Sequence, residues 1–320
     1  MPDAEILLVK RSDGSQPLKK IYEKGIEILS SLDQSRISNS DVLVIASPSS
    51  LHYNDVAETI SLTRSVLIEK PLTANVATAL ALQGVLNKSG KRAGVGYHLR
   101  FTETVIALKK ILTDIDSGPI ISTNFQYSQK LSLWRDEIDP NKSVTARSDL
   151  GGGVLLELSH EIDALQLLVG QIVSVHTTEM RFDGAPTDGT VETLATFSGI
   201  CSTNVEFVIH LDMLADPPIR NWEFVYEKLT VKADLLAGEI FLLLGKNEVL
   251  KIYASMERER EMAENKLLLS FLSSMNFLPM EFCTVSEALN VMYVIESVRN
   301  SYNSGCLESV ITKQNSNGVI

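Results

Sequence analysis

The chain has 320 residues, of which 44% are hydrophobic and 22% are charged, and it carries a formal net charge of −11 with a pI near 5.0. This length and composition predict a globular protein with one large domain or two smaller ones. The negative charge argues against a nucleic-acid partner, because proteins that bind phosphate backbones gather positive charge on one face.

The sequence also argues against a membrane span and a disulfide framework. No stretch of about 18 consecutive apolar residues is present, and Met1 is followed by no basic and then apolar signal. The three cysteines, Cys201, Cys283 and Cys306, are far apart and form no C-x-x-C pair for a metal or redox site. We therefore expect a cytoplasmic protein with reduced thiols.

In the first hundred residues, short apolar runs alternate with helical patterns. The runs are Glu5–Val9, Asp41–Ala46, Ser65–Ile68 and Arg92–Gly96. This alternation predicts βαβ units and a parallel sheet. One helix is expected over Ala74–Lys88, with Thr73 as its N-cap and Gly90 just past its end.

Two of these predicted strands run into polar turns. Val66–Ile68 is followed by Glu69-Lys70-Pro71, and Asp41–Ala46 is followed by Ser47-Pro48-Ser49 and then His52. The carboxyl ends of parallel strands open on the ligand crevice, so both turns are expected there. Lys70 is therefore a candidate for chemistry, although a strand-end lysine can also simply face solvent. His52 is either a functional imidazole or a polar residue at the start of the next helix.

The second part of the chain has a different pattern. After a helix expected over Glu103–Thr113 come strand-like segments at Ile120–Tyr127, Ile172–Arg181, Val191–Phe197, Ser202–His210, Trp222–Lys232 and Glu239–Leu244. Consecutive strands predict a second, largely antiparallel domain. Between the first two strands, Gly151-Gly152-Gly153 leads into an apolar helical pattern over Val154–Val169, and a closing helix is expected over Ser286–Tyr302.

Glu157, His160 and Asp163 are spaced by three residues within this glycine-led helix. Three helical residues turn about 300°, so the three side chains span a sector of roughly 120°. An imidazole with a reference pKa of about 6.5 beside carboxylates is a sound general acid or base. A polar helix face in solvent gives the same pattern. The H-E-x-x-H zinc motif is incomplete, because position 164 is alanine.

Together these segments resemble the glucose-fructose oxidoreductase, inositol dehydrogenase and rhizopine-catabolism family (Gfo/Idh/MocA) of nicotinamide-dependent sugar dehydrogenases. The resemblance covers nearly the whole chain. It rests on Asp41–His52, Glu69–Pro71, Gly94–Phe101, Gly151–Gly170 and Ser286–Gly305. Trp134-Arg135, Ser143–Arg147 and the sequence Glu157–Glu161 are most similar to members of surface-polysaccharide and sugar-nucleotide pathways.

The resemblance implies an α/β fold, with a Rossmann domain over residues 1–98 and a substrate-binding and oligomerisation domain with a large, mostly antiparallel open sheet over residues 99–320. It implies that Lys70 orients the reacting hydroxyl and that His160 takes its proton. Asp163 matches a recurrent acidic position. The family often has an aspartate four residues before the histidine, where this chain has Leu156, and Glu157 is its candidate substitute.

The same resemblance implies two sets of ligand contacts. The expected cofactor contacts are Lys10, Arg11, Ser47, Pro48, Ser49, His52, Glu69, Lys70 and Pro71. The candidate sugar contacts are Tyr97, Arg100, Trp134, Arg135 and Arg147, each of which could equally be structural.

The chain departs from the family at its beginning. A Rossmann domain opens with a strand and a Gly-x-Gly-x-x-Gly turn that binds the pyrophosphate, and this chain contains no such motif. We expect Glu5–Val9 to be the family's second strand, so that the central strand is missing and Met1 is either an internal methionine of a longer reading frame or the start of a truncated protein. Val9 is followed by Lys10 and Arg11, which favours NADP slightly over NAD, although a solvated Lys-Arg pair is an equal explanation.

The leading prediction is an NAD(P)-dependent oxidoreductase that transfers hydride between the cofactor and a sugar or sugar nucleotide, as a homo-oligomer without nucleic-acid or membrane partners. The rival is a non-catalytic member with impaired cofactor binding that associates through its second sheet.

Overall fold

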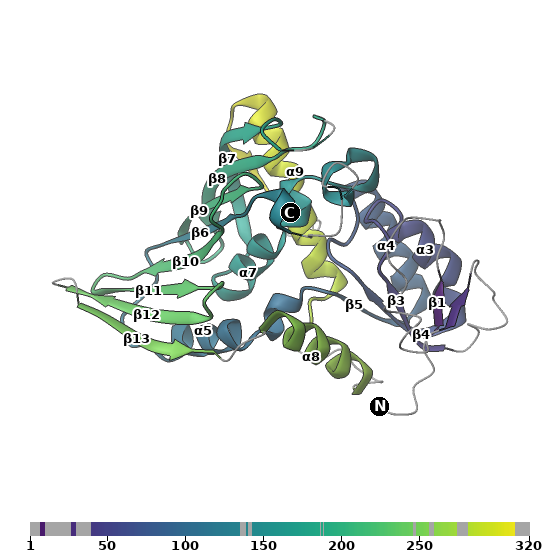
Figure 1. The fold of residues 1–320 in the computed structure, drawn as a ribbon, viewed down its shortest axis with the longest axis horizontal. Helices are drawn as coiled ribbons and strands as arrows, with labels where there is room; N and C mark the ends of the chain where they lie inside the picture. Colours follow the sequence, from purple (N-terminus) through teal and green to yellow (C-terminus); the bar gives the residue numbers. More distant parts are fainter. Residues whose placement is uncertain are drawn as a thin grey trace, which may run out of the picture.

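The computed structural model describes residues 7–9, 27–29, 40–134, 139, 143–185, 187, 189–245, 248–255, 259–273 and 281–310. These residues form a small parallel sheet on one side, a large sheet on the other and helices between them (Figure 1).

The parallel sheet contains β3 (Ser40–Ile45), β4 (Thr63–Ile68) and β5 (Arg92–Val95) in that order. On β4, Val66 and Ile68 point into the main core with helix α3 (His52–Thr59), whereas Leu67 packs with α8 (Glu259–Ser273) on the opposite face. Because β4 is covered on both faces, all three of these positions are apolar, as a doubly covered parallel strand requires.

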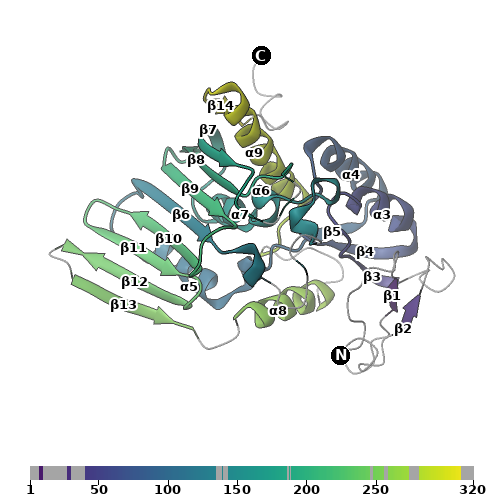
Figure 2. The same ribbon diagram turned by 45° about the horizontal axis from the view of Figure 1, so that its top comes forward.

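Two further parallel strands, β1 (Leu7–Val9) and β2 (Glu27–Leu29), form a separate sheet. Figure 2 shows them at the end of the molecule that carries β3 and β4. β1 agrees with the predicted run at Glu5–Val9, and β2 had no counterpart among the predicted strands. Within the described residues the parallel strands thus form a pair and a triplet, and parallel strands are what a Rossmann-type domain requires.

The large sheet has nine strands in the order β13-β12-β11-β10-β6-β9-β8-β7-β14. Their bounds are β6 Ser122–Ser128, β7 Ile172–Arg181, β8 Leu194–Cys201, β9 Glu206–Asp212, β10 Ile219–Val225, β11 Leu229–Asp234, β12 Glu239–Leu244, β13 Glu248–Ala254 and β14 Glu308–Ser309. All neighbours are antiparallel except β6 and β9. The single strand predicted over Trp222–Lys232 is wrong, because a turn between Val225 and Leu229 divides it, and β13 was not predicted.

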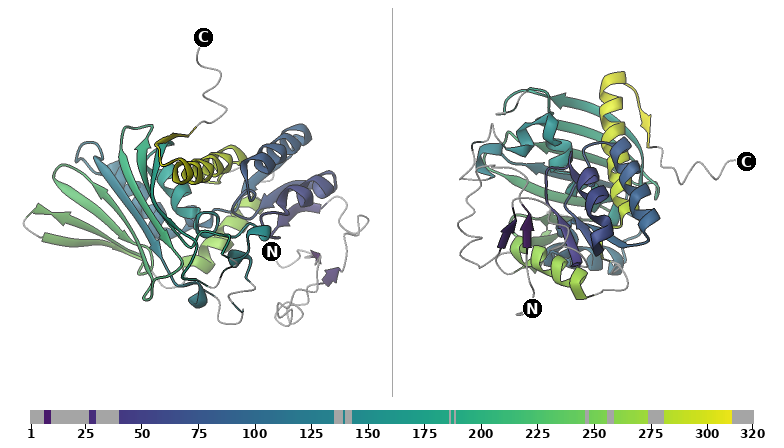
Figure 3. Two further views of the ribbon diagram at one scale, coloured as in Figure 1. Left: turned by 90° about the horizontal axis from the view of Figure 1, so that it is seen from above. Right: turned by 90° about the vertical axis from the view of Figure 1, so that its right-hand side faces the viewer.

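Helices α7 (His160–Leu168) and α9 (Val285–Ser304) lie between the large sheet and the parallel sheet, while the other face of the large sheet carries no helix of the described chain (Figure 3). The long α9 begins with a capping box at Thr284 and Glu287. A single core includes residues of both sheets and of α9.

Further helices are α4 (Val76–Ser89), α5 (Glu103–Asp114), α6 (Val154–Glu157) and the 3₁₀ helix η2 (His98–Phe101). The N-cap of α4 is Asn75, whose side chain accepts from the Thr78 N–H, and not Thr73 as predicted. Gly90, with φ of 63°, ends that helix as expected.

The continuous helix predicted over Val154–Val169 is also wrong. The chain leaves helical geometry at Leu158, where φ is −96° and ψ is 22°, and α7 starts afresh at His160. Glu157 and His160 therefore lie on two different helices, on either side of this break.

Candidate active site

Lys70 lies at the carboxyl end of β4. The Glu69 N–H still donates to the Ile45 carbonyl of β3, 2.8 Å away, so the turns that follow the two strands lie side by side. The Lys70 ammonium donates to the Glu157 carbonyl oxygen at 2.8 Å and pairs with the Glu157 carboxylate at 3.2 Å. Only 15% of the Lys70 side chain is exposed. The ammonium is thus fixed at the end of α6 rather than free in solvent.

The imidazole of His160 lies among rings from the segment after β5. Its ring centroid is 4.5 Å from that of His98 and 5.4 Å from that of Tyr97, both in edge-to-face geometry. Tyr97 is fully buried and donates its hydroxyl to Ser159 at 3.3 Å, and burial raises its pKa well above the usual value. Tyr97 was predicted as a sugar contact, but the structure places it inside the core.

Two contacts flank the break between α6 and α7. Glu157, before it, contacts the Lys70 ammonium, and His160, after it, contacts the ring of His98. His98 was not among the residues that we selected from the sequence. The sequence feature that could have identified His98 is its position in Gly94–Phe101, a strand and turn whose end is expected at the same crevice as Lys70.

Arg100 and Asp163 form a buried ion pair with each other. Nε of Arg100 donates to one carboxylate oxygen at 2.9 Å and Nη2 to the other at 2.6 Å, while Nη1 donates to Glu287 on α9 at 3.1 Å. Although burial opposes it, the Asp163 carboxylate raises the pKa of Arg100. Arg100 was expected to bind the sugar and Asp163 to take part in catalysis. The structure disagrees with both expectations, because each side chain is buried and forms its ion pair with the other.

A second buried pair follows directly after His160. Glu161 is fully buried and accepts from Nε of Arg220 on β10 at 2.7 Å. The Arg220 guanidinium lies 4.3 Å from the ring centroid of Tyr127, on which Trp134 stacks with an interplanar angle of 8°. Burial raises the pKa of Glu161, and Arg220 offsets part of the shift. Sequence reasoning found Trp134 but missed Glu161 and Arg220, which are 59 residues apart.

His52 connects the two strand-end turns. Its ring is 1% exposed, with Nδ1 3.1 Å from the Leu72 carbonyl and Nε2 2.9 Å from the Ser47 carbonyl. Burial lowers its pKa, and the contacts with the backbone oppose the shift. Of the two interpretations of the sequence, this geometry agrees with a structural residue at the start of α3.

The other predicted cofactor contacts lie around this connection. Ser47 donates to Asp55 at 2.5 Å, Ser49 donates weakly to the Gly151 carbonyl at 3.4 Å, and the Lys70-Pro71 peptide bond is cis. Pro48 accepts from the Leu51 N–H through its carbonyl. Glu69 lies against Gly96, where an added Cβ would meet its carboxylate at 3.3 Å.

Arg147, a predicted sugar contact, pairs with the exposed Asp149. Lys10, Arg11 and Arg135 lie outside the described residues. Among the described residues, no helix is long and apolar enough to cross a membrane.

The two adjoining turns and the fixed lysine fit the nicotinamide end of a dinucleotide, because they present polar groups at the carboxyl ends of parallel strands. The residues do not fit the pyrophosphate end in the usual way, because the sequence has no Gly-x-Gly-x-x-Gly turn to bind it.

Comparison with known proteins gives the same assignment. Residues 5–97 match the model of the oxidoreductase family with an NAD-binding Rossmann fold, Gfo/Idh/MocA. The chain is 28% identical over 172 residues to 1-carboxy-3-chloro-3,4-dihydroxycyclohexa-1,5-diene dehydrogenase of Comamonas testosteroni, covering 52% of this chain and 42% of that protein. It is 30% identical over 149 residues to the rhizopine catabolism protein MocA of Rhizobium meliloti, covering 45% and 44%.

The matched regions thus span less than half the length of these two relatives. Among solved structures, levoglucosan dehydrogenase in complex with NADH superposes with a TM-score of 0.82 at 15% sequence identity, over 97% of this chain and 90% of that one. The sequence motifs and these matches lead to one conclusion: residues 5–97 belong to the Gfo/Idh/MocA oxidoreductase family, and the chain as a whole has the fold of the superposed dehydrogenase.

Proposed function

We propose that the protein is a nicotinamide-dependent oxidoreductase that acts on a secondary alcohol or ketone of a sugar or sugar nucleotide. The observation that carries the proposal is the arrangement at the α6–α7 break, where Glu157 fixes the Lys70 ammonium three residues before His160. A fixed cation and an imidazole at the carboxyl ends of parallel strands are the groups that alcohol oxidation needs.

In this proposal Lys70 binds the oxygen of the reacting carbon and stabilises the negative charge that develops on it. Glu157 holds the ammonium in position through its carbonyl and its carboxylate. His160 accepts the hydroxyl proton when the alcohol is oxidised and returns it when the ketone is reduced, and His98 packs against its ring. The nicotinamide, when bound, supplies the hydride chemistry.

The substrate class rests on the same region of the protein and on one neighbour. Trp134 and Tyr127 stack beside the Arg220–Glu161 pair, and aromatic rings next to planar polar groups suit a sugar ring. A structural neighbour is a levoglucosan dehydrogenase. We assign Trp134 to this side of the site, and we keep Arg135 and Arg147 as sugar contacts proposed from the sequence.

For the cofactor, the proposal is NADP ahead of NAD, because Lys10 and Arg11 follow β1 and two cations suit a 2′-phosphate. The division into domains over 1–98 and 99–320 is likewise a proposal. So is a homo-oligomer built on the open face of the large sheet. The exposed apolar side chains of Val208 on β9 and Val249 on β13 support it.

The test is isothermal titration of the whole chain with NADPH and with NADH. We expect saturable binding, tighter for NADPH, and a joint Lys10→Ala and Arg11→Ala variant should lose that preference while it keeps NADH affinity. A folded sample that binds neither cofactor would contradict the proposal and favour the non-catalytic alternative. If a cofactor binds, a panel of sugars and sugar nucleotides assayed by nicotinamide absorbance then tests the substrate class.

A further inference from the structure

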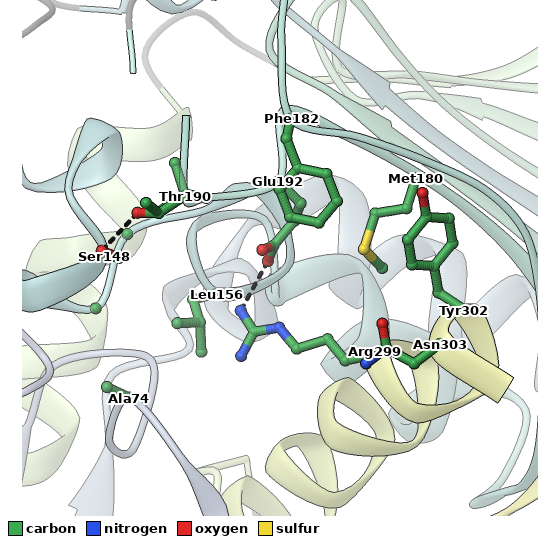
Figure 4. A pocket seen from close by; sticks show the side chains of 13 residues that line it. Ala74, Ser148, Leu156, Met180, Phe182, Thr190, Glu192, Arg299, Tyr302 and Asn303 are labelled. Atoms are coloured by element: carbon green, nitrogen blue, oxygen red, sulfur yellow. Dashed lines mark hydrogen bonds and ion pairs between the residues drawn. The ribbon is translucent and has the colours of Figure 1, made fainter. Parts of the chain in front are cut away.

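A cavity of about 270 Å³ lies apart from Lys70 and the histidines, none of which lines it. Its walls come from the loop at 148–152, the end of β7, the segment 190–192 and the last turns of α9 (Figure 4). Nothing in the proposed reaction uses these side chains.

A partly buried ion pair forms one wall of the cavity. Nη2 of Arg299 donates to Oε1 of Glu192 at 2.8 Å, and the exposed fractions of the two side chains are 34% and 5%. Glu192 also binds the first turn of α6. Its carbonyl accepts a hydrogen bond from the Val154 N–H at 2.8 Å, and its carboxylate accepts one from the Leu155 N–H at 3.4 Å. Among the described residues, Arg299 donates to Glu192 alone, which leaves most of its five N–H groups available on the cavity side.

A second part of the lining is aromatic. The rings of Phe182 and Tyr302 lie 6.2 Å apart, and the two residues are 37% and 41% exposed. Met180 and Leu156 continue the apolar surface. Asn303 adds an amide beside Arg299 (Figure 4). The cavity therefore combines an accessible ring surface with a cluster of hydrogen-bond donors.

We infer that this cavity is a binding site for a small organic anion, a carboxylate or phosphate ester with a single apolar ring. The oxyanion accepts hydrogen bonds from Arg299 and Asn303, and the ring packs on Phe182 and Tyr302. Guanidinium groups bind both kinds of oxyanion in fork geometry. The volume lies below the roughly 300–1,000 Å³ of pockets for drug-sized ligands, which limits the ligand to about one ring.

The Glu192 carboxylate should lower the affinity of the cavity for an anion. It competes with the ligand for Arg299 and repels an anion, so removal of its charge should strengthen binding, whereas removal of the Arg299 charge should weaken it. A site that merely favoured apolar rings would respond to neither change.

The experiment is a saturation-transfer NMR titration of the full chain with phenyl phosphate and benzoate, with cyclohexanol as the neutral probe. We expect dissociation constants on the order of 1 mM for at least one anion and no saturation by cyclohexanol. Arg299→Gln should weaken anion binding about tenfold or more, since a hydrogen bond to a charged group contributes about 1.5–3 kcal/mol. Glu192→Gln should tighten it.

Tyr302→Ala tests the aromatic wall at an exposed position that tolerates truncation, and it should also weaken binding. Arg64→Gln, at an exposed arginine paired with Asp41, is the matched control and should change nothing. The relative response to phenyl phosphate and benzoate identifies the preferred oxyanion. Three results would overturn the inference. They are no saturable binding of either anion, affinity of Arg299→Gln and Tyr302→Ala equal to that of the unchanged protein, and displacement of the anion by NADPH. The last result would place the probe at the cofactor site instead.

Discussion

Arg100 and Asp163, 63 residues apart in the chain, form a two-pronged ion pair in the interior, with N–O distances of 2.6 and 2.9 Å. The pair joins the turn after β5 to α7, and through Glu287 it extends to α9. It is therefore a connection between the parallel sheet and the helices that cover the large sheet.

Asp163→Asn should destabilise the protein by about 3–5 kcal/mol, because it leaves the Arg100 charge buried without its main partner. Chemical denaturation followed by circular dichroism measures the change. Asp149→Asn, which breaks the exposed pair with Arg147, should cost less than about 1 kcal/mol. If Asp163→Asn kept full stability and lost only activity, Asp163 would be a catalytic residue after all.

Lys70→Ala should reduce turnover by about 10²–10³ through loss of stabilisation of the developing oxyanion. Its effect on folding should be small, because the partner Glu157 remains 24% exposed to water. Steady-state rates and melting temperatures report the two effects separately. Lys110→Ala, at an exposed lysine of α5, is the control. Turnover unchanged by Lys70→Ala would remove the lysine from the mechanism.

His160→Asn should lower the rate by about 10²–10⁴ and remove the limb of the pH–rate profile that reports deprotonation of the base. His98→Asn keeps that limb if His98 only packs against the other ring, as their edge-to-face contact indicates. The measurement is kcat/KM as a function of pH for both variants. A profile that loses its limb with His98→Asn and keeps it with His160→Asn would reverse the two roles.

Asp212 should make stability depend on pH in the acid range. Burial opposes it, but hydrogen bonds from His210, Ser128 and two backbone N–H groups lower its pKa to about 2. Since the unfolded value is about 3.9, this stabilisation is complete above that pH and is lost as the pH falls towards 2.

Asp212→Asn should therefore lower the melting temperature at neutral pH and flatten its decline between about pH 4 and pH 2. Thermal unfolding across that range tests it, with the exposed Asp114→Asn as a control. An unchanged acid limb in Asp212→Asn would show that other carboxylates cause the decline.

Local features of the fold could be predicted from the sequence. The apolar run before Glu69 and the periodicity of the later segments indicated β4 and several strands of the large sheet to within a few residues, because burial on one or both faces leaves a direct pattern. The break at Leu158 could not be predicted in this way. Apolar residues occupy nearly every position from Val154 to Leu158, so no periodicity shows where the helix stops.

The candidate site was only partly predictable for a related reason. Lys70 and His160 could be selected because each follows a recognisable local pattern. Their partners could not, since the Lys70–Glu157 contact joins residues 87 positions apart and the Glu161–Arg220 contact joins residues 59 apart. Such pairs are set by the packing of the two sheets, which no short stretch of sequence encodes.

One short stretch, residues 157–163, supplies three carboxylates, and each is paired with a cation from a different element: Glu157 with Lys70, Glu161 with Arg220, and Asp163 with Arg100. The positive charges around the proposed reaction centre are therefore already neutralised. A phosphate that bound Arg220 or Arg100 would have to displace the carboxylate of Glu161 or Asp163, both of which are buried, at a cost of several kcal/mol. If the proposed reaction centre is correct, we expect the reacting carbon to belong to an uncharged part of the substrate, and any phosphate that the substrate carries to bind farther from these pairs.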